Sequence, residues 1–501
     1  MQFPHQPLAP LALLSAAAGA LAVLAFAPFG WFPLAVLSLA LAYGLIAGQS
    51  PRRAFWIGWA YGIGLMGVGV LWIRISLNEF GNMAAWLAHL LTFLFVLGMG
   101  LYYGLAGWLV ARLSAHSAVA GALLVFPGVW VLAEWLRGWL FTGFPWLALG
   151  YSQIDAPLAG WAPVVGVYGL SLAVALSAGL LWVAVTRSGR GRIGALAVLA
   201  LLWLSGFLIG RIEWTQPAGE PLRATVVQAN VQQSLKWDPE SRIPTLRAYV
   251  ELTRANLGSD LIVWPETAVP DFLHQVRNAF ITPLTEEVRE AGAELVLGIP
   301  VLDLETGDYF NGLIAIGSGE DLYFKRHLVP FGEFMPFKAW LGPLAEAFEV
   351  PMSDFSAGAA PRPLLQVGPH PVGASICYED AFPAEVAQAL PDAAYLINVS
   401  NDAWFGDSLA PHQHLEIARM RSRENERALV RATNTGISAI MDHRGRVLGT
   451  VPAFQRGVLT ATIQPRAGAT PFAASGHWPV VLAALLMSLL GLAWARRVPR
   501  T

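Results

Sequence analysis

The chain has 501 residues, of which 55% are hydrophobic and only 13% are charged, and its formal net charge is −2. Soluble domains carry about 25% charged residues, so this composition excludes a protein that is water-soluble throughout. The near-neutral charge gives no support for nucleic-acid binding. Most carboxylates lie after Glu213, and this asymmetry predicts a membrane part followed by a water-soluble part. About 250 residues suffice for the hydrophobic core of the latter.

Eight apolar segments predict transmembrane helices, each of which needs about 20 mainly apolar residues. They cover residues 11–27, 33–47, 54–73, 84–110, 118–136, 164–185, 193–209 and 478–495. The first segment lacks the basic region of a signal peptide and is followed at once by further spans, so we expect a retained helix. The chain then divides into seven helices at residues 1–212, a soluble domain at residues 213–475, and an eighth helix with a tail at residues 476–501.

The arginines predict how these spans are oriented, because cytoplasmic loops are enriched in positive charge. The odd-numbered connections between spans hold at most one arginine each. Arginines collect instead in the even-numbered connections and in the tail, namely Arg52, Arg53, Arg112, Arg187, Arg190, Arg192, Arg496, Arg497 and Arg500. Both termini are therefore predicted to be cytoplasmic, with the soluble domain on the extracytoplasmic side.

Charged residues are rare in the predicted membrane part, and two of them, Glu134 and Arg137, stand three positions apart in one predicted helix. Side chains at this spacing share a helix face, so we expect a structural ion pair. A functional role is the alternative, because intramembrane charges often serve function.

Beyond Arg223, short apolar runs alternate with amphipathic patterns. The runs at residues 224–231, 260–264, 294–299, 310–316, 373–376 and 394–399 are bounded by turn-forming residues, which is typical of buried strands. Helical patterns cover residues 239–257, 275–291, 383–390 and 412–431, and residues 436–463 predict further strands. Strands that alternate with helices predict a layered α/β domain.

Two stretches of this half have an unusual composition. Residues 419–427 combine arginines with glutamates, and these mixed signs predict a salt-bridged, solvated helix face. Residues 334–348 hold many large apolar side chains in an expected loop. They either pack on their own domain or form a lid that dips into the membrane.

Three short motifs carry side chains that can perform chemistry. Val263-Trp-Pro-Glu266 places a carboxylate just past a predicted strand, and Lys325 follows another predicted strand. Cys377, the only cysteine, ends an apolar run and precedes Tyr378 and Glu379. A lone cysteine can be an inert buried thiol, but a thiol with a base and a cation as partners is typical of a nucleophile.

With these motifs in this order, the sequence resembles the nitrilase, or carbon–nitrogen hydrolase, superfamily. Together with the predicted spans, it is similar over essentially its whole length to the apolipoprotein N-acyltransferase family of bacterial inner membranes. The resemblance implies a polytopic α-helical membrane domain with eight spans and an extracytoplasmic nitrilase-like α-β-β-α sandwich. It also implies that an acyl chain passes from a phospholipid, expected to be phosphatidylethanolamine, through a thioester to the α-amino group of a diacylglyceryl-cysteine on an apolipoprotein.

The three residue types also fit these roles on chemical grounds. A thiol is mostly protonated at neutral pH, so Cys377 needs a base, and Glu266 is the candidate. Lys325 would hold the negative charge of the tetrahedral intermediate. The alternatives are a surface carboxylate and a solvated lysine, which are the common states of these side chains.

Further residues are carried over from the resemblance. Glu333 and Tyr378 are expected to support the site and Glu379 to orient the turn at the cysteine, although either glutamate could belong to a structural ion pair. Trp237 lies in a stretch that resembles the family's substrate-contacting loop, with a buried tryptophan as the alternative. Asn311, beside a strand start, is a weaker candidate for substrate binding.

No metal site or cofactor is expected. His412, His414 and Glu416 have a suggestive spacing, but neither an HExxH pattern nor cysteine partners accompany them. Two other classes of function remain as alternatives. One is a membrane-tethered amidase or nitrilase that uses water as the acceptor, and the other is a transporter or scaffold, against which the sparse intramembrane charge argues.

Overall fold

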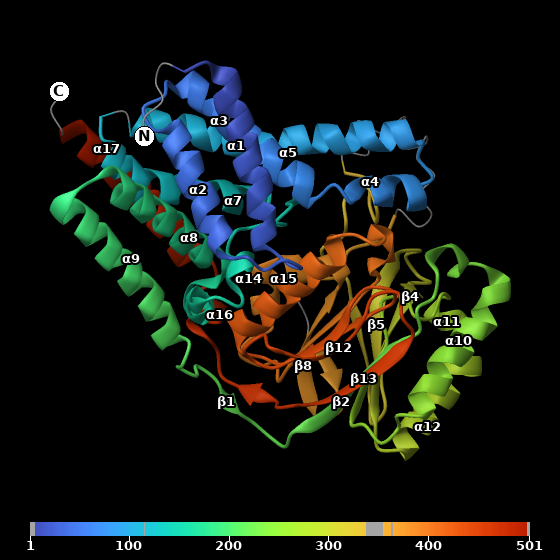
Figure 1. The fold of residues 1–501 in the computed structure, drawn as a ribbon. Helices are drawn as coiled ribbons and strands as arrows, with labels where there is room; N and C mark the ends of the chain where they lie inside the picture. Colours follow the sequence, from blue (N-terminus) through green and yellow to red (C-terminus); the bar gives the residue numbers. More distant parts are fainter. Residues whose placement is uncertain (1–5, 115, 337–353, 362–363, 498–501) are drawn as a thin grey trace. The chain divides into compact units, whose positions relative to one another are not determined.

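The computed structural model describes residues 6–114, 116–336, 354–361 and 364–497, and the chain forms two compact units (Figure 1). The first unit contains the described residues of Met1–Arg74, Trp86–Glu213 and Ser475–Thr501. The second contains those of Ile75–Ala85 and Trp214–Ala474. Residues 75–85 therefore belong with the second unit, whereas the sequence analysis assigned them to the seven-helix domain.

The first unit is helical. Its helices include α1 (Leu8–Ala22), α2 (Pro33–Ile46), α3 (Pro51–Gly69), α5 (Ala85–Leu113), α7 (Phe126–Arg137), α8 (Ala162–Thr186), α9 (Gly189–Ile209) and α17 (Trp478–Arg497). Six helical stretches in the described chain are long and apolar enough to cross a membrane. A seventh qualifies if α3 and the helical segment Ile73–Phe80, bent from it by 58°, count as one span.

The prediction of a polytopic helical domain is confirmed, but the count of eight spans is not. Where the bent pair counts as one span, the difference lies at α2, which has only 14 residues. At 1.5 Å per residue such a helix covers about 21 Å, which is less than the roughly 30 Å hydrocarbon core of a bilayer.

Glycines allow α1 and α3 to approach closely. A Cβ atom at Gly64 would lie 1.9 Å from the carbonyl oxygen of Ala16, and one at Gly19 would lie 2.1 Å from that of Tyr61. No side chain larger than hydrogen fits at either position. This is the small-residue packing by which membrane helices gain contact without a hydrophobic driving force.

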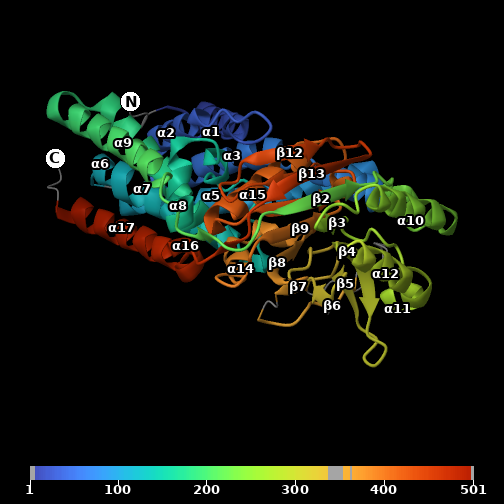
Figure 2. The same ribbon diagram turned by 90° about the horizontal axis from the view of Figure 1, so that it is seen from below.

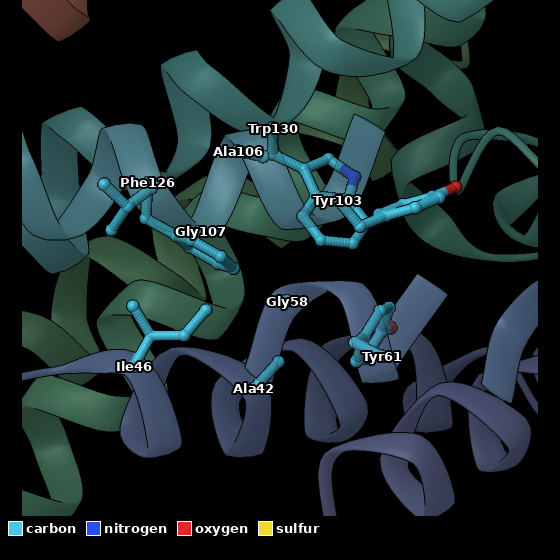
Figure 3. Close-up of a pocket in the computed structure, with 10 residues that line it drawn as sticks. Ala42, Ile46, Gly58, Tyr61, Tyr103, Ala106, Gly107, Phe126 and Trp130 are labelled. Atoms are coloured by element: carbon cyan, nitrogen blue, oxygen red, sulfur yellow. The ribbon is translucent and has the colours of Figure 1, made fainter. Parts of the chain in front are cut away.

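Aromatic rings pack against one another inside this unit. The ring of Trp130 lies 5.5 Å from that of Tyr61, 5.2 Å from that of Tyr103 and 5.8 Å from that of Phe126, measured between centroids. Figure 3 shows these side chains around a cavity of about 10 Å³, which is roughly the space of one water molecule. The cavity is therefore too small to hold an acyl chain.

The hydrogen bonds described for Glu134 and Arg137 join each of them to other groups and not to one another. Glu134 accepts hydrogen bonds from Trp130 Nε1 at 2.8 Å and from the backbone N–H of Leu149 at 3.0 Å. Arg137 donates to the carbonyl oxygen of Phe144 at 2.6 Å. Both residues thus tie α7 to the chain that follows it, which is a structural role.

The second unit consists of strands and helices in alternation. Its strands are β1 (Gln216–Pro217), β2 (Leu222–Gln228), β3 (Leu261–Val263), β4 (Glu294–Leu302), β5 (Tyr309–Ile316), β6 (Glu320–Phe324), β7 (Leu365–Val367), β8 (His370–Ile376), β9 (Leu396–Ser400), β10 (Leu429–Thr433), β11 (Ser438–Met441), β12 (Val447–Val451), β13 (Gly457–Ile463) and β14 (Arg466–Ala467). Its helices include α10 (Pro239–Arg254), α11 (Leu273–Val276), α12 (Thr282–Glu290), α14 (Pro383–Ala387), α15 (Ala410–Asn425) and α16 (Pro471–Ser475). One sheet has the strand order β12-β11-β10-β9-β8-β7 and the other β13-β2-β3-β4-β5-β6.

These elements form four layers. A core between the two sheets contains side chains from both, such as Val263 of β3 and Ile397 of β9. A second core joins α10, α11 and α12 to the outer face of one sheet, and both ribbon views draw α11 and α12 beside β4 and β5 (Figures 1 and 2). A third core joins α14 and α15 to the other sheet through residues such as Val386 and Ala418. The predicted α-β-β-α sandwich is confirmed.

The strand directions explain why the three motifs can meet. Strands β2, β3 and β4 are parallel, and β6 runs the same way because β5 is antiparallel to both β4 and β6. Strands β8, β9 and β10 are parallel in the other sheet. In α/β proteins the carboxyl ends of parallel strands carry the functional groups. The chain reaches Glu266, Lys325 and Cys377 directly after the carboxyl ends of β3, β6 and β8.

The predicted solvated face at residues 419–427 is wrong. Arg421 and Glu424 of α15 are both completely buried, and their side chains form an ion pair of 2.8 Å. The reason is the position of α15, which packs against β10, β11 and the turn after β8. Mixed charges therefore neutralise one another inside the domain instead of facing water.

The apolar stretch at residues 334–348 can be compared with its prediction only at its start. Phe334, Met335 and Pro336 are described, and the first two are partly buried. Residues 337–348 lie outside the described residues, so the membrane-dipping lid stays a prediction.

The buried pair of α15 generates a stability prediction. The Glu424→Gln variant leaves the Arg421 guanidinium buried without its carboxylate, which we expect to cost about 3–5 kcal/mol of unfolding free energy. The thermal unfolding midpoint of the purified protein should fall by roughly 6–20 °C. The control is Glu287→Gln, which breaks the exposed pair of Glu287 and Arg254 and should leave the midpoint nearly unchanged. Equal shifts in the two variants would contradict the prediction.

Candidate active site

Cys377 stands at a sharp turn. It follows β8 and begins a short 3₁₀ helix, η9 (Cys377–Ala381), with a backbone φ of +51°. A side-chain-bearing residue rarely adopts this left-handed conformation, and such strain is found at functional sites. The side chain is only 9% exposed. The turn therefore holds the thiol in one constrained position at the end of the strand.

Glu379 holds that turn and connects it to the segment that carries Lys325. Its carboxylate accepts a hydrogen bond of 2.7 Å from the backbone N–H of Ile376. It also accepts one of 2.9 Å from the hydroxyl of Tyr323 and one of 2.9 Å from the backbone N–H of Arg326. A single buried carboxylate thus ties the end of β8 to the end of β6.

Tyr378 packs beside the same turn. Its ring lies 5.8 Å from the imidazole of His327 and 5.1 Å from the ring of Phe382, measured between centroids. Tyr378 is 9% exposed. The ring therefore lines the segment after β6 and helps to fix its path, which is compatible with the supporting role expected from the sequence.

Lys325 lies between two carboxylates. Its Nζ atom is 2.7 Å from Glu333 Oε1 and 3.6 Å from Glu266 Oε1, and its side chain is 1% exposed. Burial alone would lower the pKa of Lys325, but the charges of Glu333 and Glu266 outweigh it and raise the pKa above its ordinary value. Lys325 is therefore a permanent cation over the whole physiological pH range.

Asn311 contacts the carboxylates directly. Its Nδ2 atom donates to Glu266 Oε1 at 2.7 Å and to Glu333 Oε1 at 3.1 Å. The sequence analysis proposed a substrate contact for this residue, whereas these contacts indicate that its amide nitrogen positions the two acids. Asn311 can contact both acids because it lies on β5, between β3, which leads to Glu266, and β6, which leads to Lys325.

Trp237 lies in the loop after β2 and is 44% exposed. The alternative of a buried tryptophan is therefore wrong. An exposed indole remains available to a ligand, so its role as a substrate contact stays a prediction.

Two further groups that the sequence analysis missed contact Glu266. The backbone N–H of Asn401, just after β9, donates to Glu266 Oε2 at 2.8 Å. The Nζ atom of Lys236 donates to the carbonyl oxygen of Glu266 at 3.2 Å. Two features of the sequence could have indicated these groups. One is the polar run of Ser400, Asn401 and Asp402 at the end of a buried strand, and the other is a lysine adjacent to Trp237.

The surroundings of Cys377 favour the protonated thiol at rest. Burial, and next the negative charge of Glu266, raise the pKa of the thiol, while Lys325 opposes this rise. A thiol that is not ionised in advance needs a base at the moment of attack. Glu266 is a buried carboxylate whose charge reaches the thiol, so it can take that proton.

A network of buried charges lies beneath the turn. His414 Nε2 is 3.0 Å from Asp380 and 3.4 Å from the carbonyl oxygen of Cys377, and its Nδ1 is 2.9 Å from Asp402. Arg431 pairs with the same two aspartates, at 3.3 Å and 3.0 Å. Because every member is buried, this network fixes the backbone on which the thiol stands.

The same network holds His414, one of the two histidines with the suggestive spacing. His414 is engaged with two aspartates that also bind an arginine, and this is an arrangement of ion pairs. Within the described ranges, no cluster of three or more histidine, cysteine, aspartate or glutamate side chains has the geometry to hold a metal ion.

Sequence comparisons identify relatives of both units. Residues 18–180 match the family described as Apolipoprotein N-acyltransferase N-terminal domain, and residues 223–472 match the family described as Carbon-nitrogen hydrolase. A Methylococcus capsulatus protein named apolipoprotein N-acyltransferase is 46% identical over 485 residues, which cover 97% of this chain and 96% of the relative. Proteins of the same name from Pseudomonas syringae pv. tomato and Azotobacter vinelandii are 41% and 42% identical, over 97% and 99% of this chain and 97% of each relative.

Solved structures give a weaker likeness. A carbon–nitrogen hydrolase superfamily protein from Xanthomonas campestris covers 53% of this chain and 97% of its own, with a TM-score of 0.37 and 19% identity. This likeness is too weak to carry a conclusion.

The buried network generates a pH prediction. Burial and Arg431 lower the pKa of His414, but Asp380 and Asp402 outweigh them and raise it to about 9, against about 6.5 in an unfolded chain. Since the folded pKa is the higher one, charged His414 stabilises the fold fully below pH ~6.5, and this contribution is lost as the pH rises to about 9. We expect the charged imidazole to contribute up to about 3 kcal/mol to the free energy of unfolding.

The measurement is the thermal midpoint of the unmodified protein and of His414→Gln between pH 6 and pH 9.5. The two curves should be far apart at pH 6 and converge toward pH 9.5, because the glutamine carries no charge at any pH. Their difference isolates His414 from the other groups that titrate in this range. A constant separation would contradict the assignment of a charged imidazole.

Proposed function

This chain belongs to the apolipoprotein N-acyltransferase family, and we propose that it works through a thioester acyl-enzyme on Cys377, with Glu266 and Lys325 as its partners. Its activity is the N-acylation of apolipoproteins, the function for which its relatives of nearly full length are named. The donor, the catalytic residues and the location of the reaction are the parts that we propose.

In the first half-reaction, Glu266 takes the proton of the Cys377 thiol while the sulfur attacks the carbonyl carbon of a phospholipid ester. A C–S bond forms, and the ester C–O bond breaks when the tetrahedral intermediate collapses. The departing alkoxide takes the proton from Glu266, so lysophospholipid leaves and the carboxylate is restored. Lys325 and a backbone N–H of η9 stabilise the oxyanion.

In the second half-reaction, the α-amino nitrogen of a diacylglyceryl-cysteine attacks the thioester. A C–N bond forms and the C–S bond breaks. Glu266 carries one proton from the nitrogen to the departing thiolate, so Cys377 returns as a thiol. The product is the N-acylated apolipoprotein.

One observation carries this proposal more than any other. The carboxylate of Glu266 is held on one oxygen by Asn311 and on the other by the N–H of Asn401, and it lies 3.6 Å from Lys325. A carboxylate oriented in this way can exchange protons repeatedly without changing its position. Glu333 keeps Lys325 in place, and Glu379 keeps the turn in place.

The proposed location follows from the substrates and the arginine distribution. We infer a bacterial inner-membrane protein whose catalytic part, residues 213–475, lies on the periplasmic side between membrane parts at residues 1–212 and 476–501. Both termini are then cytoplasmic, where the arginine-rich connections lie. The donor is a phospholipid of the same membrane, for which phosphatidylethanolamine is our candidate.

An amidase or nitrilase would use the same three side chains with water as the acceptor. It is the weaker candidate because the full-length relatives are named for acyl transfer to an apolipoprotein. The two functions differ in whether the acyl-enzyme persists in water until an amine arrives.

The proposed mechanism predicts an acyl-enzyme that can be observed directly. Protein incubated with phosphatidylethanolamine should gain the mass of one acyl group on Cys377, as measured by mass spectrometry of the intact protein and its peptides. Adduct formation should fall at least about 100-fold in Glu266→Gln and in Lys325→Ala, because these variants lose the base and the oxyanion partner. Glu290→Gln, at an exposed carboxylate, is the matched control and should form the adduct normally.

An unmodified Cys377 together with transfer activity in Cys377→Ser would overturn the mechanism. Rapid loss of the acyl group to water, in the absence of an amine acceptor, would favour the amidase instead.

The proposed orientation of the chain in the membrane can be tested by labelling single cysteines. Cys377 is the only cysteine, so Cys377→Ala provides a background without thiols in which Glu305→Cys and Arg190→Cys each introduce one at an exposed position. A membrane-impermeant maleimide should label position 305 in intact spheroplasts and label position 190 only after lysis. The reverse labelling pattern would contradict the proposed topology.

A further inference from the structure

The first unit contains a cavity of about 350 Å³ that has no part in the mechanism above. The cavity around Trp130 has a volume of only about 10 Å³, whereas small-molecule sites in proteins usually have volumes of about 300–1,000 Å³. The larger cavity therefore has the size to hold a substantial part of a ligand.

Three stretches of the helical unit form this cavity. α8 ends at Thr186 and α9 begins at Gly189, and α9 lies beside α8 at the edge of the unit in both ribbon views (Figures 1 and 2). The third stretch is α6 (Ala118–Ala120) with the π-helix η3 (Gly121–Val125). The third stretch and α8 give the cavity an apolar wall, which includes Val119, Leu123, Leu180 and Val183.

The side of the cavity that α9 forms is open. Gly194 lines it, and a Cβ atom at this position would have no contact within 4 Å outside the backbone of its own helix. Val198 also lines it and is 47% exposed. Because α9 is long and apolar enough to cross a membrane, its exposed flank is suited to face lipid chains. The cavity is thus accessible to an acyl chain of the bilayer.

Two cations line the same cavity where α8 is connected to α9. They are Arg187 and Arg190, and both are exposed. Residues 80–133 and 156–212, which include every stretch that forms the cavity, contain no aspartate or glutamate. The positive charge of the two guanidinium groups is therefore not neutralised by the elements around it.

An anionic phospholipid has the two properties that this cavity complements. Its acyl chains match the apolar wall, and its phosphate matches the guanidinium groups, which bind phosphate oxygens through paired N–H donors. Basic pockets between transmembrane helices on the cytoplasmic side are known to bind anionic headgroups. A phosphatidylethanolamine molecule also carries an ammonium group and has no net charge, so two arginines without acidic neighbours favour the anionic lipid.

We propose that the cavity between α8, α9 and residues 118–125 binds one anionic phospholipid, with an acyl chain along the apolar wall and the phosphate on Arg187 and Arg190. This lipid is a bound component of the helical unit and not the acyl donor. All residues of the site belong to the first unit, whereas the three candidate catalytic residues belong to the second. The proposal therefore does not depend on the acyl-enzyme mechanism.

The general enrichment of arginine in cytoplasmic connections accounts for the presence of these residues, but not for their position in the lining of a cavity. Arg192 provides the comparison, since it is exposed in the same part of the chain and is not among the lining residues. Arg112 is a second exposed arginine outside the lining. Variants at these positions change the net charge equally and leave the cavity intact.

The test measures lipid binding to the purified full-length protein in detergent. The protein carries Cys377→Ala, so that no acyl transfer to the thiol consumes the lipid. It is titrated with phosphatidylglycerol or with phosphatidylethanolamine, and native mass spectrometry gives the number of bound lipids and their apparent Kd. The cavity variant combines Arg187→Gln with Arg190→Gln, and the matched control combines Arg112→Gln with Arg192→Gln.

We expect one phosphatidylglycerol molecule to bind more tightly than phosphatidylethanolamine. The cavity variant should bind it about 30-fold more weakly, because each arginine near an anionic headgroup strengthens binding by a factor of about five. The control variant should bind it normally. Gly194→Leu keeps both arginines but fills the space of the acyl chain, so it should lose most of the binding. An excess of glycerol phosphate, which has no acyl chain, should not displace the lipid.

Equal losses in the cavity variant and in the control would overturn the proposal, since the arginines would then act only through net charge. Equal affinity for the two lipids would overturn it as well. Normal binding by Gly194→Leu, or displacement of the lipid by glycerol phosphate, would indicate a phosphate site without an acyl chain. Failure of the unmodified protein to form an acyl-enzyme would overturn the proposed mechanism and leave this inference in place.

Discussion

The buried ammonium of Lys325 is the charge around which this site is built. A cation removed from water costs several kcal/mol unless anions and hydrogen bonds surround it, and here Glu333 lies at 2.7 Å and Glu266 at 3.6 Å. Asn311 then connects the two carboxylates, so the cation, the acids and the amide hold one another in place. Lys236 is also buried, and it donates to the backbone carbonyl oxygen of Glu266 at 3.2 Å.

The thiol is held by a second set of buried charges. Glu379 connects the end of β8 to the end of β6, so the cysteine turn and the lysine segment share one carboxylate. Beneath the turn, the network around His414 contacts the carbonyl oxygen of Cys377 itself. The left-handed backbone conformation of Cys377 costs free energy, and these hydrogen bonds hold the chain in that conformation. Buried polar groups of the sandwich thus lie where the backbone must keep an unfavourable conformation.

Much of this arrangement could be predicted from the sequence. Apolar segments of membrane length indicated the helical domain, because hydrophobic periodicity is a local property. The alternation of strand and helix patterns predicted the α/β sandwich, and the position of Glu266, Lys325 and Cys377 after strands predicted that they could share one edge. The resemblance added the order of the motifs and the family. The prediction of eight spans went too far at α2, where composition indicated a span that the helix, with 14 residues, is too short to form alone.

The sequence by itself therefore determined the two kinds of domain and the positions of the three candidate catalytic side chains, since both follow from local patterns. Only the tertiary structure decided what surrounds those side chains. Asn401 donates to Glu266 from 135 residues further along the chain, and no local spacing encodes such a contact. Arg421 and Glu424 are buried because α15 packs on a sheet, although their mixed-charge pattern predicts a solvated helix face. Lys236 and Lys325 are the same residue type in the sequence and both are buried, but two carboxylates beside Lys325 raise its pKa, whereas burial lowers the pKa of Lys236.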